Sequence, residues 1–139
     1  MKITLICSIC ALLMILIVSC ESNDALEFDR YYAEGNVIYQ SHCQNCHGAH
    51  GEGLNGLIPP LTDSVFLKNN RDQLACLVHN GLHGKITVTK KDFTEKMPAA
   101  ADLANIEIAQ ALTYVTNSFG NKMGIVNVEE VNGDLVKCL

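Results

Sequence analysis

The sequence predicts a small all-α domain with three main helices. Three segments, at about 30–42, 69–80 and 102–119, carry apolar residues at helical spacing. A glycine follows the second and the third, as is common at a helix end. The stretch 81–96 mixes glycine, lysine and β-branched residues and predicts only an irregular loop or a hairpin. A chain of 139 residues is long enough for one such domain.

The chain begins with the pattern of an export signal. Lys2 gives a charged start, and residues 3–18 are apolar apart from small polar residues, which is the length of a signal core. The stretch ends Ile17-Val18-Ser19-Cys20, which resembles the lipobox of bacterial lipoproteins. We therefore predict a signal peptide over 1–19 and acylation of Cys20, which would hold the domain on a membrane of the bacterial cell envelope, facing the periplasm. An uncleaved anchor helix is the alternative.

A polar segment separates this signal from the first predicted helix. Residues 20–29 are polar and acidic with little periodicity, so they predict a tether between the lipid and a domain over 30–139. From Arg30 to His42 apolar and aromatic residues recur near helical spacing. The first helix thus leads directly into the motif that follows.

That motif, Cys43-Gln44-Asn45-Cys46-His47, carries the strongest chemical signal of the chain. Two thiols at this spacing can add across the two vinyl groups of a porphyrin, and the next histidine can reach the iron. The motif predicts one covalently attached haem c on Cys43 and Cys46, with His47 as an axial ligand. The alternatives are a zinc site, which needs two more ligands, and a thioredoxin-like pair, which needs a βαβ unit.

The next two segments predict loops. Residues 48–56 contain four glycines and an asparagine, as in a chain that turns closely around something. Pro59 and Pro60 force the following residues into an extended conformation.

The helices predicted after these loops differ in the strength of their sequence pattern. The segment 69–80 places Leu74, Leu77 and Val78 on one face, and 102–119 has a broader apolar stripe. Residues 127–130 resemble a capping box and predict a brief last helix.

Five of the seven cysteines are taken up by the signal, the lipid and the haem, which leaves Cys76 and Cys138. In an oxidising compartment two remaining thiols favour a disulfide between the middle of the domain and its C-terminal end. The alternative is a buried free thiol, because Cys76 shares an apolar helical face with Leu74 and Leu77.

The formal net charge of −5 argues against a nucleic-acid partner. Within this acidic chain, four lysines crowd one segment: Lys85, Lys90, Lys91 and Lys96. They predict either a docking patch for an acidic partner protein or a solvated loop.

From about Tyr31 to Gly120 the chain resembles the class I cytochromes c, bacterial single-haem electron carriers. Gly35 and Tyr39 match the glycine and the aromatic residue of the family's first helix, and Ala111 and Tyr114 match the crossing positions of its last helix. The resemblance implies a small cytochrome c fold, with loops wrapped around one covalently bound haem.

The same resemblance implies the second iron ligand. In the family this ligand is a methionine in a late loop, and Met97-Pro98-Ala99 matches that pattern. Pro59 matches the proline whose carbonyl accepts the Nδ1–H of the axial histidine. The alternative ligands His79 and His83 would give a bis-histidine centre of lower potential.

An iron with both axial positions filled by protein does not readily bind substrate. Together with the predicted lipid on Cys20, the resemblance therefore implies a membrane-anchored, non-enzymatic carrier of single electrons between redox proteins of a respiratory chain. The alternative is an electron-relay subunit of a larger oxidase, dehydrogenase or reductase complex. A haem sensor or a peroxidase-like enzyme would require Met97 to leave the iron and an acid–base group at the open position.

Overall fold

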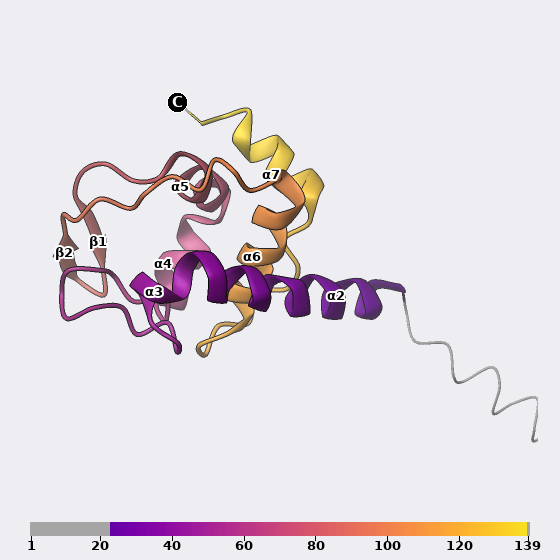
Figure 1. Ribbon diagram of the computed structural model, residues 1–139, viewed down its shortest axis with the longest axis horizontal. Coiled ribbons are helices and arrows are strands. Elements are labelled where there is room, and N and C mark those ends of the chain that lie inside the picture. Colours follow the sequence, from indigo (N-terminus) through magenta and orange to yellow (C-terminus); the bar gives the residue numbers. More distant parts are fainter. Residues whose placement is uncertain (1–22, 139) are drawn as a thin grey trace, which may run out of the picture.

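The computed structural model describes residues 23–138 of the chain, and helices make up most of its regular structure (Figure 1). In chain order the elements are α2 (Asn23–Ile38), the π-helical turn η1 (Tyr39–Cys43), α3 (Gln44–His47), α4 (Ser64–Asn69), the 3-10 turn η2 (Arg71–Gln73), α5 (Leu74–Asn80), β1 (Ile86–Val88), β2 (Lys91–Phe93), α6 (Asn105–Asn117) and α7 (Val128–Leu135). The strands form one antiparallel hairpin, with Thr87 opposite Asp92. The prediction of an all-α domain is confirmed.

The crossing of α2 and α6 forms the centre of the core. A Cβ on Gly35 would overlap the carbonyl oxygen of Gln110, so the two backbones touch at that point. Beside it, the rings of Tyr39 and Tyr114 lie 5.3 Å apart, and Tyr39 is 1% exposed. The close approach at Gly35 brings the end of α2, and with it the cysteine motif, against the last long helix.

Within the predicted tether over 20–29, residues 23–29 are helical, because α2 begins at Asn23. Phe28 stacks on Tyr32 one helical turn later, with ring centroids 5.9 Å apart, and Tyr32 packs on Tyr114. A pair four residues apart supports a helix even where the surrounding sequence is polar. The first turns of α2 therefore project from the domain as a helix (Figure 1).

The structure does not contain the single helix predicted over 69–80. The chain forms α4, η2 and α5 in succession, and α4 lies before the predicted start. Asp63 explains this start, because its Oδ1 accepts hydrogen bonds from the backbone N–H groups of Val65 and Phe66 at 3.1 and 3.0 Å.

Other predicted elements are confirmed. The hairpin lies inside 81–96, α6 lies inside 102–119, and α7 begins at the predicted cap, where Asn127 Oδ1 accepts from Glu130 N–H at 2.8 Å. A disulfide joins Cys76 in α5 to Cys138, with Cα atoms 5.6 Å apart.

Within residues 23–138, no helix has both the length and the apolar character needed to cross a membrane. The predicted signal peptide and Cys20 lie outside the described residues.

Candidate haem site

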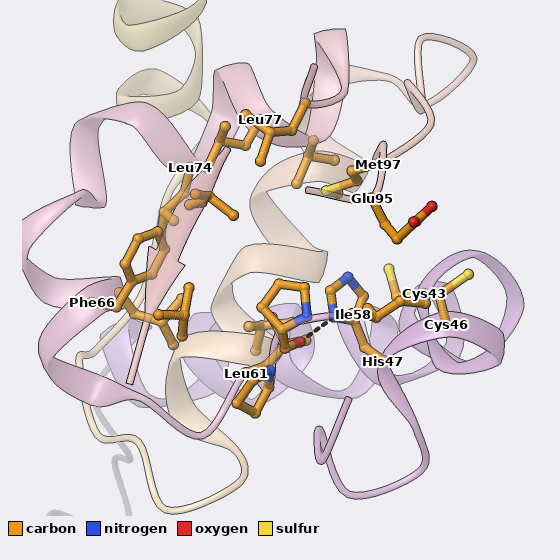
Figure 2. Close-up of a pocket in the computed structure, with 18 of the residues that line it drawn as sticks. Cys43, Cys46, His47, Ile58, Leu61, Phe66, Leu74, Leu77, Glu95 and Met97 are labelled. Atoms are coloured by element: carbon orange, nitrogen blue, oxygen red, sulfur yellow. Dashed lines mark hydrogen bonds between the residues drawn. The ribbon is translucent and has the colours of Figure 1, made fainter. Parts of the chain in front are cut away.

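An apolar cavity opens between the cysteine motif and the elements that follow it (Figure 2). Its walls come from α4, α5, α6 and the loop after the motif, and include Phe66, Leu74, Leu77, Val78, Leu112 and Val115. The lining is almost entirely hydrocarbon, which suits the faces of a porphyrin ring. All five residues predicted for haem attachment, iron binding and support of the axial histidine line this one cavity: Cys43, Cys46, His47, Pro59 and Met97.

His47 is buried at the end of α3, and its hydrogen bonding shows which ring nitrogen is available to bind a metal. Its Nδ1 lies 3.1 Å from the carbonyl oxygen of Pro59. Because a carbonyl oxygen can only accept, Nδ1 carries the proton and Nε2 keeps its lone pair, which is the tautomer that binds a metal. Burial lowers the pKa of His47, although the hydrogen bond to Pro59 acts in the opposite direction. The imidazole is therefore held neutral and oriented.

Cys43 and Cys46 lie at the mouth of the cavity, and neither is in a disulfide. Cys43 is half-buried and Cys46 is exposed. Burial, together with the neighbouring Cys46, raises the pKa of the Cys43 thiol to about 11. A thiol with a raised pKa stays protonated at neutral pH, whereas a redox-active pair of this spacing depends on a lowered pKa. This environment is unfavourable for the thioredoxin-like alternative.

The glycine loop holds the Pro59 carbonyl in place. Tyr39 Oη donates to the carbonyl of Gly48 at 2.6 Å, and the Gly53 N–H donates to the carbonyl of His47 at 2.8 Å. Gly53 has φ +70°, and a Cβ there would overlap the carbonyl oxygen of Ile58. Only glycine allows the loop to return this closely to the motif.

Met97 reaches the cavity from the opposite side to His47, and Figure 2 shows the two side chains pointing toward each other across the cavity. The backbone of Met97 exchanges two hydrogen bonds with Leu82, at 3.0 and 3.1 Å. This pairing fixes the methionine just beyond the end of α5.

The alternative ligands do not reach the cavity. His79 and His83 stand four residues apart, a spacing that zinc sites also use, yet neither lines the cavity with the cysteine motif. His79 Nδ1 instead lies 2.8 Å from Asn80 Oδ1, and His83 is exposed.

The four lysines do not form one uniform positive patch. Lys85 pairs with Asp92 at 2.9 Å, and Lys90 and Lys91 lie at the turn of the hairpin. Lys96 borders the cavity together with the oppositely charged Glu95.

The donor set therefore consists of two thiols at the mouth, one imidazole and one thioether, around an apolar slot. This set fits a haem c, which two thiols can bond to and which takes nitrogen and sulfur ligands on its iron. Asp63 and Arg71, which hold neighbouring elements in place, escape prediction from the sequence. An aspartate before Ser64 is a cap signal that could have revealed the first; nothing local marks the second.

Comparison with known proteins agrees with this donor set. Residues 31–115, more than half of the chain, match the family model described as cytochrome C oxidase, cbb3-type, subunit III. The matched span contains the cysteine motif and Met97 and ends within α6. No curated protein shows significant similarity to the chain.

Proposed function

Since the chain belongs to this family of cytochrome c domains, and is thus a haem-containing electron carrier or subunit, we propose that it carries single electrons between respiratory partners while anchored to a membrane through lipid on Cys20. The observation that carries the proposal is the placement of His47 and Met97 on opposite sides of one apolar cavity that has the two thiols at its mouth (Figure 2).

In this proposal each group has a defined task. Cys43 and Cys46 would hold the haem through thioether bonds, and His47 Nε2 and Met97 Sδ would bind its iron. The bound haem supplies a one-electron change between ferric and ferrous iron. Pro59 keeps the imidazole oriented and increases its donor strength. The hydrocarbon walls exclude water and keep the charge change in a medium of low polarity.

The two axial side chains also favour a carrier over an enzyme. A saturated iron has no open position for a substrate, and the soft thioether favours the ferrous form relative to a second imidazole. Among the residues that line the cavity, Glu95 and Lys96 are the charged ones, and both are exposed. Peroxidase-like chemistry would need a protected acid–base group at an open distal site.

A role as the electron-relay subunit of an oxidase is the second candidate. It is favoured by the description of the matching family, which names a subunit of a terminal oxidase. Copurification of an oxidase with the chain from membranes, at low and at moderate salt, separates a permanent subunit from a carrier that exchanges partners.

Methionine ligation can be tested on the purified holoprotein. Ferric iron bound to a thioether gives a weak charge-transfer band in the far red, and we expect this band in the native chain. Met97→Ala should abolish it and lower the reduction potential. Met123→Leu is the matched control, because Met123 is the other methionine within residues 23–138 and does not line the cavity. A native protein without the band, or a Met97 variant that keeps it, would refute the ligand assignment.

A further inference from the structure

The C-terminal part of the chain lies outside the region that matches the family. The match ends at residue 115, whereas the described residues continue through α7 to residue 138, and α7 packs beside α5 (Figure 1). Two attachments tie this segment to η2 and α5: one runs from Arg71 to Glu130, and the other from Cys76 to Cys138. We refer to these four residues as the C-terminal clamp.

Arg71 makes the first attachment with its whole guanidinium group. Nε and Nη2 donate to the two carboxylate oxygens of Glu130, at 2.6 and 2.9 Å. Nη1 donates to the carbonyl of Met123 at 3.0 Å, and Nη2 donates to that of Ile125 at 2.7 Å. A bidentate pair with two further carbonyl acceptors fixes both distance and orientation. The start of the η2–α5 segment is thus held against the chain that leads into α7.

The disulfide makes the second attachment. Cys76 lies in α5 next to Leu77, which lines the cavity, and Cys138 lies just beyond α7. The clamp therefore holds the η2–α5 segment at two points, one before α5 and one within it. No clamp residue lines the cavity.

The far end of α5 carries the Met97 loop. The carbonyl of Val78 accepts from the N–H of Ala100 at 3.0 Å, and Leu82 is paired with Met97. Between them Gly81 has φ +73°, and a Cβ there would lie 2.5 Å from the Met97 carbonyl oxygen. The end of α5 and the backbone of Met97 are in close contact, with no free space between them. A displacement of α5 would therefore also displace the methionine.

We propose that the C-terminal clamp positions Met97 for iron binding by holding α5 still. The inference rests on Met97 as the axial ligand, which is part of the proposed function. A thioether is a weak donor, so its bond to the iron depends on a backbone that keeps the sulfur in place. Arg71 and the disulfide act through α5 and are positioning groups rather than ligands.

The test compares two clamp variants with a control in α7. The variants are the double substitution Cys76→Ser with Cys138→Ser, and the single substitution Arg71→Gln. The control is Asn132→Ala, because Asn132 Oδ1 accepts from Asn105 Nδ2 at 2.6 Å and so ties α7 to α6 instead of α5. Each is made in the full-length holoprotein. At neutral pH we measure carbon monoxide binding to the reduced form, the far-red band of the oxidised form, and the urea midpoint.

Both clamp variants should bind carbon monoxide about tenfold faster than the native chain and show a weaker band, within the usual range for coupling between packed elements. Asn132→Ala should stay within about twofold of the native rate. Amide exchange at Ile108, which lies in the α2–α6 core, should become faster only by as much as the loss of global stability explains, whereas exchange at Ala100 should become faster than that loss explains. If the disulfide variant does not fold, Arg71→Gln provides the same comparison.

The proposal is overturned if the clamp variants lower the urea midpoint yet leave the carbon monoxide rate and the band unchanged. It is also overturned if Asn132→Ala speeds binding as much as the clamp variants do, because a general loss of stability then explains the effect. A native protein that itself binds carbon monoxide rapidly and lacks the band refutes the Met97 ligation of the proposed function, a different result from either of these.

Discussion

The two sides of the cavity are held by different kinds of contact. On the His47 side the contacts are local: Tyr39 bonds to Gly48 and His47 to Pro59, with partners nine and twelve residues apart. On the Met97 side the methionine loop rests on the end of α5, and α5 is fastened by contacts that span 59 and 62 residues. The orientation of His47 is thus set by residues close to it in the sequence. The position of Met97, in contrast, rests on contacts between residues that are far apart in the sequence.

This difference agrees with what each side chain would need as an iron ligand. The imidazole must present one tautomer in one orientation, and a single short loop with one carbonyl achieves this. The thioether has no second hydrogen-bonding group that could orient it, so only packing and the backbone can place it. The five predictions below either break one side or provide a comparison for the contrast between them.

The largest effect is expected from the disulfide on the Met97 side. Replacing Cys76 and Cys138 by serine opens a loop with a sequence separation of 62 residues. By the chain-entropy argument this should cost about 4 kcal/mol of unfolding free energy. Urea unfolding of the holoprotein measures the loss, and a loss below about 1 kcal/mol would mean that the long-range contact contributes little.

Breaking the His47 side should have the next largest effect. Gly53→Ala adds a Cβ that overlaps the Ile58 carbonyl oxygen, at a residue with φ +70°. We expect a loss of roughly 2–3 kcal/mol from strain and overlap together. Gly124→Ala is the control, since Gly124 has φ +76° and open space around it, so it should cost about 1 kcal/mol from strain alone. Equal losses in the two variants would show that the loop can relax away from the overlap.

Asp63 connects the start of α4 to the hairpin turn, outside both sides, and its removal should have a smaller effect. Its Oδ1 caps α4, and its Oδ2 accepts from the Thr89 N–H in the hairpin turn at 3.0 Å. Asp63→Ala should cost about 1 kcal/mol, as is typical for the loss of a helix cap. The measurement is the urea midpoint at pH 7, with Asp102→Ala as an exposed control.

The pH dependence of the same contact has a defined sign. The backbone N–H groups of Phe66, Thr89 and Val65 bind the carboxylate and lower the pKa of Asp63. A lowered pKa means that this stabilisation is complete above the unfolded pKa of about 3.9 and is lost as the pH falls through the folded value. The difference between native protein and Asp63→Ala should therefore shrink below about pH 4. A difference that grows in acid would contradict the assignment.

The smallest effect is expected at the surface. If Lys90 and Lys91 guide an acidic redox partner, the variant with both changed to glutamate should show slower electron transfer at low salt and a flatter dependence on ionic strength. Lys122→Glu serves as the control, because this lysine is exposed and lies outside the hairpin. An unchanged salt slope would leave the two lysines as a solvated turn.

The sequence was most informative where the structure depends on local chemistry. The helical stripe of α6, the glycine loop and the cysteine motif are all encoded in short stretches. Gly35, which was matched to the glycine of the family's first helix, lies where α2 and α6 cross. The helical residues 23–29 were missed because one aromatic pair, Phe28 with Tyr32, outweighs a polar composition.

The Met97 side could be predicted only in part. The methionine followed from a family resemblance, and the disulfide partners from counting cysteines. The contacts of Arg71 could not be foreseen, because Glu130 and the two carbonyl acceptors come together only after α7 has packed on α5. Contacts that depend on tertiary packing leave no spacing pattern in the chain.

The most direct test of the central claim asks whether the haem is bonded to the motif. Extraction of the denatured holoprotein with acidified organic solvent should leave the pigment on the polypeptide, at one haem per chain. The variant with Cys43→Ser and Cys46→Ser should release any pigment that it binds. Pigment that leaves the native chain, or stays on the double variant, would contradict covalent attachment at Cys43 and Cys46.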